Sequence, residues 1–315
     1  MSEFPNNPSK IRKLYDSGYE GAKHDPQDIA RLMGELRHPV FGIAASAGDL
    51  YEDVEGALAK SYESYLALDP KAFSEQQTEG SCVGHATRNA VDATRAIEIL
   101  IRGETEGWVT RGATEGIYGS RGHRSSGMYC SSAARFMEDT GGILLRKEYD
   151  FADLSVLNDR ISQKWGGGRM PKAVYREGKR HQVRTVSLVS TTLEAMVALH
   201  NGYVISSCGS QSWSSTRDGE GISEETRPGW AHAITIIGYD DTRLLDDDTL
   251  WILANSWGTW NRGGHPPWGK LPVGCWLSRN RPIERRLSQN GSYAYSNVDG
   301  FEPRRLPDMG ATGHV

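Results

Sequence analysis

The chain has little of what marks secreted scaffolds or membrane-spanning proteins. Its 315 residues include only four cysteines, widely separated and without a Cys-x-x-Cys pair, which predicts free thiols in a reducing compartment rather than a disulfide framework. No run of about 18 apolar residues occurs, and the N-terminus lacks the basic start and the apolar core of a signal peptide. We therefore expect a cytoplasmic or virion-associated protein with no membrane partner.

The chain also has little excess of charge of either sign. It contains 36 Lys and Arg residues and 40 Asp and Glu residues, for a formal net charge of −4. Without a basic face, nucleic acid is not an expected partner. No cluster of His, Cys, Asp and Glu has the spacing of metal ligands, and the glycine-rich stretch 165–169 lacks the Lys-Ser/Thr of a phosphate-binding loop. The sequence thus indicates neither a metal nor a cofactor, and it leaves the oligomeric state open.

The first part of the chain, residues 1–69, has the character of an N-terminal extension, an arm or cap that is helical in part. Two short helices are expected there, Lys10–Tyr15 and Gln27–Leu36. Between Asp49 and Leu68, apolar and aromatic residues follow a helical spacing that ends before Pro70, which predicts one longer amphipathic helix.

The stretch Gln76-Gln77-Thr78-Glu79-Gly80-Ser81-Cys82 places one thiol where a polar loop becomes a helix. Small or apolar residues recur every three to four positions from 83 to 100, and Gly103 closes the pattern, so the helix is expected to begin at Cys82. Free N–H groups and the positive end of the helix dipole favour a thiolate there. With a cation nearby, they lower a cysteine pKa from about 8.5 to roughly 3.5–7.5. The alternative is an ordinary buried thiol at a helix start.

The following residues alternate between expected loops and short elements. Residues 104–124 are expected to be rich in loops, and Ser125-Ser126-Gly127-Met128 opens a second helix that ends at the glycine pair 141–142. Beyond them, 183–189 reads as a strand, Thr191 and Glu194 form a capping box for a short helix, and 203–208 reads as a buried strand. The polar run 209–228 is expected to be an exposed loop.

Two later segments place polar side chains at the ends of apolar strands. His232 opens an apolar strand that ends in Gly-Tyr-Asp, and Asn255 follows a second apolar strand at the start of Asn-Ser-Trp-Gly. A buried imidazole needs a partner for its nitrogens. A neutral amide orients the ring without cancelling the positive charge that keeps a neighbouring thiol ionised. His85 lies one turn inside the Cys82 helix and is expected to be a packing residue.

Taken together, these motifs resemble the papain-like cysteine peptidases. Members carry a Gln six residues before the cysteine of Gly-Ser-Cys, then His-Ala with Gly-Tyr-Asp, then Asn-Ser-Trp-Gly, in this order. The resemblance implies that Cys82 is the nucleophile, His232 the base and Asn255 its orienting amide. It also implies that Gln76 and the backbone N–H of Cys82 bind the oxyanion, and that Trp257 shields the site.

The match has two departures and one further candidate. Glu79 stands where many members have a second cysteine, and Val83 where they have Trp or Tyr. In many bacterial papain-like sequences, the glycine of a similar Ser-Gly pairs its backbone with bound peptide, which makes Gly127 a candidate substrate-binding residue. A glycine required only by the conformation of a helix start is the alternative. Cys130, Cys208 and Cys275 sit among apolar neighbours and are expected to be inert core thiols.

The resemblance covers roughly residues 70–280 and implies an α+β, papain-like, two-lobed fold with the active site in the cleft. A mainly helical lobe would span 70–180, a β-barrel-like antiparallel lobe 181–282, and a C-terminal tail 283–315. The implied activity is that of a cysteine-type endopeptidase that cleaves protein or peptide substrates through an acyl-enzyme. A Cys-His cell-wall amidase or endopeptidase, and an inactive binding or structural module, are the alternatives.

Overall fold

The computed structural model describes residues 41, 50, 53–102, 111–140, 142–181 and 183–306. The helices expected at Lys10–Tyr15 and Gln27–Leu36 lie outside these residues. None of the helices in the described ranges combines the length and the hydrophobicity that a membrane span requires.

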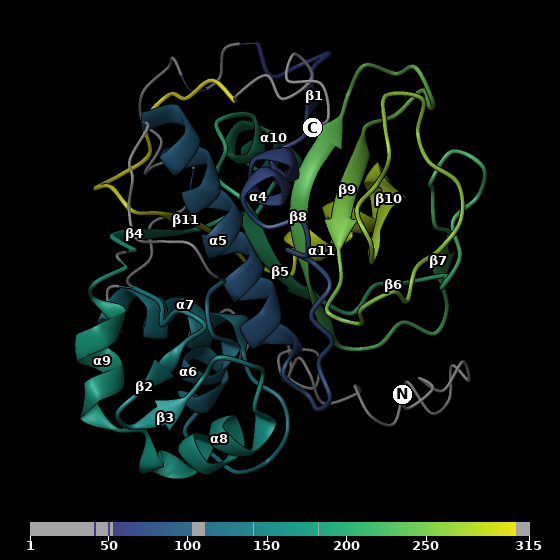
Figure 1. Ribbon diagram of the computed structural model, residues 1–315. Helices are drawn as coiled ribbons and strands as arrows, with labels where there is room; N and C mark the ends of the chain where they lie inside the picture. The colour runs from purple at the N-terminus through teal and green to yellow at the C-terminus, as the bar shows by residue number, and fades with distance from the viewer. Residues whose placement is uncertain are drawn as a thin grey trace.

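An antiparallel sheet forms one half of the molecule, with the strand order β10-β9-β8-β5-β11-β4 and β1 paired to β8 (Figure 1). Its strands are β1 (Leu58–Ala59), β4 (Thr185–Leu188), β5 (Ile205–Gly209), β8 (His232–Asp240), β9 (Leu250–Ala254), β10 (Cys275–Arg279) and β11 (Ser292–Ser296). The two longest-range pairings, β1 with β8 and β11 with β4, bring both ends of the described chain into this sheet.

The sheet is buried on both faces, because successive side chains of its strands enter different clusters. One cluster lies against α5 (Cys82–Arg102), and the other against α10 (Thr192–His200) and α11 (Asn280–Leu287). The α5 side takes Ala233, Ile252, Leu277 and Tyr295, and the opposite side takes Ile234, Leu253, Trp276 and Ala294. A helix–sheet–helix arrangement of three layers follows from this alternation.

The second half of the molecule is mainly helical and lies beyond α5, at the lower left of Figure 1. Its elements are α6 (Thr114–Gly119), α7 (Cys130–Thr140), β2 (Glu148–Tyr149), β3 (Ala152–Asp153), α8 (Asp159–Lys164), the π-helical turn η3 (Trp165–Arg169) and α9 (Lys172–Gly178). The remaining helix, α4 (Tyr62–Leu68), packs on α5. The helix α5 therefore contacts both halves, and its N-terminus brings Cys82 to their junction.

Two expectations about local structure are wrong. The helix predicted for Asp49–Leu68 is not continuous, because Asp53 and Gly56 adopt left-handed φ values of 56° and 71°, and β1 precedes α4 within this range. The expected loop at 209–228 instead contains β6 (Ser212–Trp213) paired with β7 (Glu225–Thr226). The indole of Trp213 is buried and donates to Ser278 Oγ at 2.9 Å, which draws the segment onto the sheet.

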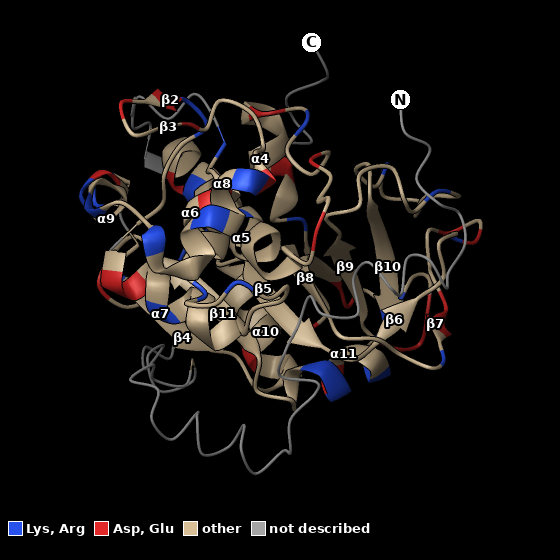
Figure 2. Ribbon diagram, turned by 90° about the horizontal axis from the view of Figure 1, so that it is seen from below, with Lys and Arg blue, Asp and Glu red and all other residues tan. Residues whose placement is uncertain are grey.

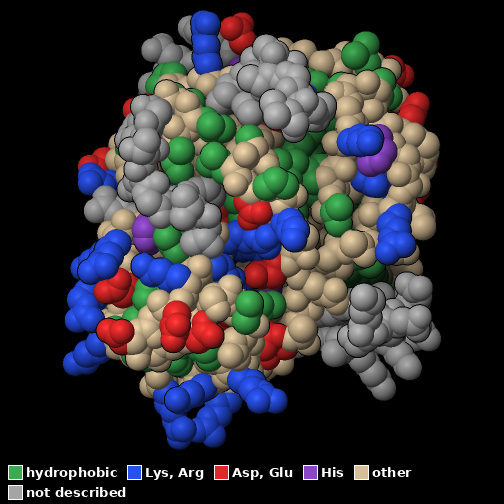
Figure 3. Space-filling model, viewed as in Figure 1, with side chains coloured by type: hydrophobic (Ala, Val, Ile, Leu, Met, Phe, Trp, Pro, Cys, Tyr) green, Lys and Arg blue, Asp and Glu red, His purple; other side chains and the backbone are tan. Residues whose placement is uncertain are grey.

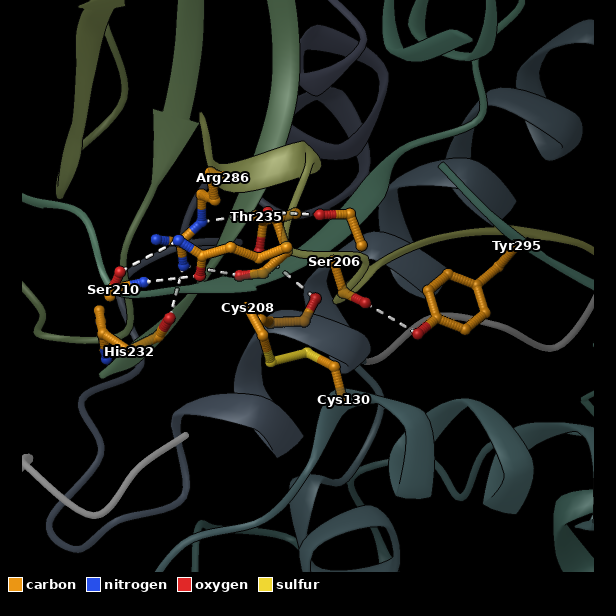
Figure 4. Close-up of a disulfide and its surroundings, with 12 residues drawn as sticks. Cys130, Ser206, Cys208, Ser210, His232, Thr235, Arg286 and Tyr295 are labelled. Atoms are coloured by element: carbon orange, nitrogen blue, oxygen red, sulfur yellow. Dashed lines mark hydrogen bonds between the residues drawn. A yellow bond between two sulfur atoms is a disulfide. The ribbon is translucent and has the colours of Figure 1, made fainter. Parts of the chain in front are cut away.

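Three further expectations also need correction. The range 104–124, expected to be rich in loops, contains the helix α6, which is buried throughout. Residues 283–306 are not a separate tail, since they complete α11 and supply β11, which lies between β5 and β4. Cys130 and Cys208 are not free thiols but form a disulfide between α7 and β5, whereas Cys275 is free and buried as expected (Figure 4).

Surface charge is mixed. On the face viewed in Figure 3, Lys and Arg side chains alternate with Asp and Glu side chains at the lower left, while hydrophobic side chains are scattered above them. Figure 2 shows Lys and Arg residues, drawn in blue, on α11. One of its arginines, Arg285, pairs with Glu225 of β7.

Candidate active site

The thiol of Cys82 lies at the first residue of α5, as the sequence predicts. Its side chain is fully buried, and the backbone amide of Ala233, the residue after His232, contacts the sulfur from β8. Burial raises the pKa of Cys82 to about 12, against the opposing influence of the amides of Ala233 and Val83 and the charge of Arg286. The expectation of a depressed thiol pKa is therefore wrong for this closed arrangement, because desolvation outweighs the helix N-terminus.

His232 and Asn255 are brought together by the pairing of β8 with β9. The imidazole Nε2 lies 2.8 Å from Asn255 Oδ1. That same oxygen accepts the backbone N–H of Ser256 at 2.8 Å, which identifies it as the acceptor end of the amide. Nε2 must then carry the proton, and Nδ1 is the unprotonated nitrogen of the neutral ring.

The Nδ1 atom of His232 is buried and has no hydrogen-bond partner among the described residues. Burial lowers the pKa of His232 to about 3; the hydrogen bond with Asn255 raises it, and the charge of Arg286 lowers it further. The imidazole is thus neutral at physiological pH. Its unprotonated Nδ1 is the ring atom that can accept a proton.

Trp257 covers the imidazole. Its ring stacks on that of His232 with centroids 4.4 Å apart and planes inclined by 30°. Trp230 stacks on Trp257 with centroids 6.1 Å apart, and Trp260 meets Trp257 edge-on at 5.0 Å. Because Trp257 is only 2% exposed, the hydrogen bond between His232 and Asn255 lies in a dry environment, where it is stronger than in water.

The two glutamines before Cys82 have different surroundings. Gln77 is buried, accepts the hydroxyl of Ser256 and donates to the carbonyl of Glu79 at 2.8 Å. Gln76 is exposed, its backbone bridges to Trp257, and its side-chain amide lies beside Gly258. Gln77 therefore takes part in the scaffold, while Gln76 keeps an accessible amide next to the aromatic cover of His232.

Gly127 lies three residues before the start of α7, with a left-handed φ of 96°. Its N–H donates to the hydroxyl of Tyr118 at 3.2 Å, so this amide is already engaged within the protein. His85 is fully buried in α5, with Nδ1 3.5 Å from Glu75 Oε2, and burial lowers the pKa of His85 to about 3. It packs inside the helical half, as the sequence predicts.

Sequence reasoning missed the groups that hold the loop before Cys82. Glu79 accepts hydrogen bonds from Ser162 Oγ at 2.9 Å and from the amide of Gln163, which fastens this loop to α8. Burial raises the pKa of Glu79 to about 7. In the sequence, the unusual acid at position 79 was the one sign of this role. Its partners lie more than 80 residues away, so no local pattern indicates them.

Arg286 was not expected near the site from the sequence, yet its guanidinium donates to the backbone carbonyl of His232. A signal was present, because Ile283 and Leu287 fall on the buried face of α11 and position 286 shares that face at helical spacing. Within the described residues, no group of three or more His, Cys, Asp or Glu side chains is arranged to hold a metal ion.

Solved structures with the same fold come from distant organisms. Xylellain, a cysteine protease from Xylella fastidiosa, matches with a TM-score of 0.51 and 14% identity over 78% of this chain and 89% of the other. Procathepsin L2 from the larval midgut of Tenebrio molitor gives a TM-score of 0.54 and 13% identity over 93% of this chain and 81% of the other. At such identities these similarities establish the fold alone. A comparison with curated proteins gives no significant match.

The sequence model of one protein family, described as papain family cysteine protease, matches residues 71–266. This range begins just before Gln76, ends after Trp257 and includes both Cys82 and His232. The match spans most of the chain and agrees with the two-lobed α+β architecture and with the order of the motifs. On these grounds the chain belongs to the papain family of cysteine proteases.

Proposed function

We propose that the protein is a cysteine-type endopeptidase in which Cys82 is the nucleophile, His232 the general base and Asn255 the residue that orients the imidazole. The observation that carries the proposal is the state of His232. Its Nε2 is committed to Asn255, and its buried Nδ1 is left without a partner among the described residues, next to the strand position that contacts the sulfur of Cys82.

The chemistry follows from these positions. Burial holds the thiol and the imidazole in their neutral forms. The thiolate–imidazolium pair therefore has to form by transfer of the proton of Cys82 to Nδ1 of His232. The sulfur attacks the carbonyl carbon of the substrate. The tetrahedral oxyanion then accepts hydrogen bonds from the backbone N–H of Cys82 and the side-chain amide of Gln76.

Collapse of this intermediate breaks the C–N bond, and the imidazolium of His232 returns its proton to the leaving amine. The remaining thioester is hydrolysed when the same imidazole removes a proton from water. Trp257 keeps bulk water away from the hydrogen bond that orients the ring. For Gly127 we propose pairing with the peptide backbone through its carbonyl, since its N–H is engaged by Tyr118.

The test compares the two free, buried cysteines. Cys82→Ala should abolish hydrolysis of a denatured protein and labelling by a thiol-directed epoxide or vinyl sulfone. Cys275→Ala, the matched control, should keep both. Undiminished activity in Cys82→Ala would rule the mechanism out, and loss of cell-wall turbidity without cleavage of protein would indicate an amidase instead.

A further inference from the structure

A buried arginine lies behind the candidate base. Arg286 of α11 is fully buried, in contrast to its neighbour Arg285, whose side chain is about one-third exposed and pairs with Glu225. Burying a guanidinium is costly unless its N–H groups find acceptors. Its acceptors therefore show what the residue does.

Four hydrogen bonds of Arg286 reach the strand ends next to the site. Nη2 donates to the carbonyl of His232 at 2.5 Å and to that of Ser207 at 2.8 Å, Nε to Ser207 Oγ at 3.0 Å, and Nη1 to the carbonyl of Gln211 at 3.4 Å. Figure 4 shows the guanidinium between α11 and the end of β8 that carries His232. These four acceptors are hydroxyl and carbonyl oxygens, and they hold the guanidinium against the ends of β5 and β8.

The surroundings are shaped to admit this side chain. Gly209 is the partner of His232 in the pairing of β5 with β8. A β-carbon at position 209 would approach Arg286 Cγ to 2.7 Å and Nη1 to 3.0 Å. Trp213 lies 5.7 Å from the guanidinium carbon, within the range of a cation–π contact. Arg286 thus occupies a fitted pocket that includes the pairing partner of His232.

The charge of Arg286 acts on both reacting groups, since it lowers the pKa of Cys82 and that of His232. Among the described residues, His85 of α5 also interacts electrostatically with His232, and Tyr118 of α6 with Cys82. His85 is neutral, because burial lowers its pKa to about 3. Tyr118 is neutral as well, because burial raises its pKa to about 12. At physiological pH, Arg286 is therefore the charged member of this group.

We propose that Arg286 is a positioning residue of the site: it fixes the backbone at His232 from α11, and its positive charge favours the thiolate of Cys82. The proposal rests on the function proposed above, but its electrostatic part concerns the ionisation of the pair and not peptide cleavage.

The test measures the rate of Cys82 alkylation by iodoacetamide against pH, which requires no turnover of peptide. A missing positive charge raises both macroscopic pKa values of a coupled pair. The profile of alkylation rate against pH should have two limbs, one for each macroscopic pKa of the pair. Arg286→Gln and Arg286→Met should therefore move both limbs to higher pH by about one unit. Arg286→Lys keeps the charge but not the fork of donors. It should hold the limbs at their wild-type positions while kcat for a peptide falls about tenfold.

Arg285→Met is the matched control, because this residue lies one position away on the same helix and faces outward; its profile should equal that of the wild type.

The inference is overturned if a folded Gln or Met variant keeps the wild-type limbs, or if the Lys variant shifts as far as they do. Circular dichroism establishes folding. If neither neutral variant folds, the Lys variant decides: unmoved limbs with reduced kcat support the inference, and moved limbs or unchanged kcat overturn it. A wild-type protein that is alkylated at Cys82 yet cleaves no peptide would refute the proposed function. The pH dependence of alkylation would still test the role of Arg286 in that case.

Discussion

Replacement of Glu75 by Gln tests the ion pairs beneath the loop that carries Gln76. Arg146 reaches both carboxylate oxygens of Glu75, with Nε to Oε1 at 3.1 Å and Nη2 to Oε2 at 3.0 Å. Arg88 donates to Oε2 at 3.2 Å, and the Glu75 side chain is 12% exposed. Burial alone would raise the pKa of Glu75, but Arg88, His85 and Arg146 together lower it to about 2.

The magnitude follows from that shift. A pKa lowered from 4.5 to about 2 corresponds to about 3 kcal/mol of folding free energy at pH 7. Because the pKa is depressed in the folded state, this contribution is complete above pH 4.5 and is lost as the pH falls through about 2. At pH 3 about 1 kcal/mol of it remains. Glu75→Gln should therefore destabilise the protein strongly at pH 7 and much less at pH 3.

Urea unfolding of the wild type and of Glu75→Gln at both pH values measures this difference. Glu63→Gln serves as the control, because Glu63 forms a partly exposed pair with Lys60 within one helical turn and should change stability by at most about 1 kcal/mol. A loss below about 1 kcal/mol for Glu75→Gln at pH 7, or an equal loss at both pH values, would refute the reasoning.

Three further predictions concern the site and the disulfide. Trp257→Ala should lower kcat/KM by about tenfold or more, since water then competes for the hydrogen bond of His232; steady-state kinetics measure it, and an unchanged value would contradict the shielding role. Burial raises the pKa of Glu79 from 4.5 to about 7, so its contribution to stability is complete below pH 4.5 and is lost as the pH rises through 7. Relative to the wild type, Glu79→Gln should gain stability between pH 5 and pH 8 in urea titrations, and a constant difference would argue against the shift. In the double variant Cys130→Ser with Cys208→Ser, the free energy of unfolding should be about 4 kcal/mol lower than in the wild type, because the disulfide closes a loop of 78 residues. Equal thermal stability of the two proteins would contradict this.

The sequence predicts best what depends on local pattern. The start of α5 at Cys82 follows from apolar spacing, and the capping box of Thr191 and Glu194 is present in the structure. The strand that begins at His232 and the strand that ends just before Asn255 are apolar runs with clear ends, so their positions could be predicted.

Contacts between distant segments were not predictable in the same way. The disulfide joins cysteines 78 residues apart, and β11 pairs with strands about 90 to 110 residues earlier. No local periodicity encodes such partners. The pKa of Cys82 was misjudged for a similar reason, because the helix start is visible in the sequence, whereas the burial that dominates it arises only from packing.

The position of β11 in the sheet has a consequence for biosynthesis. Until residues 292–296 have left the ribosome, β5 and β4 lack the strand that separates them, and the nascent chain exposes two unpaired edges. Arg286 is translated only shortly before this strand. The active site should therefore be completed late, after almost the whole described chain has been synthesised.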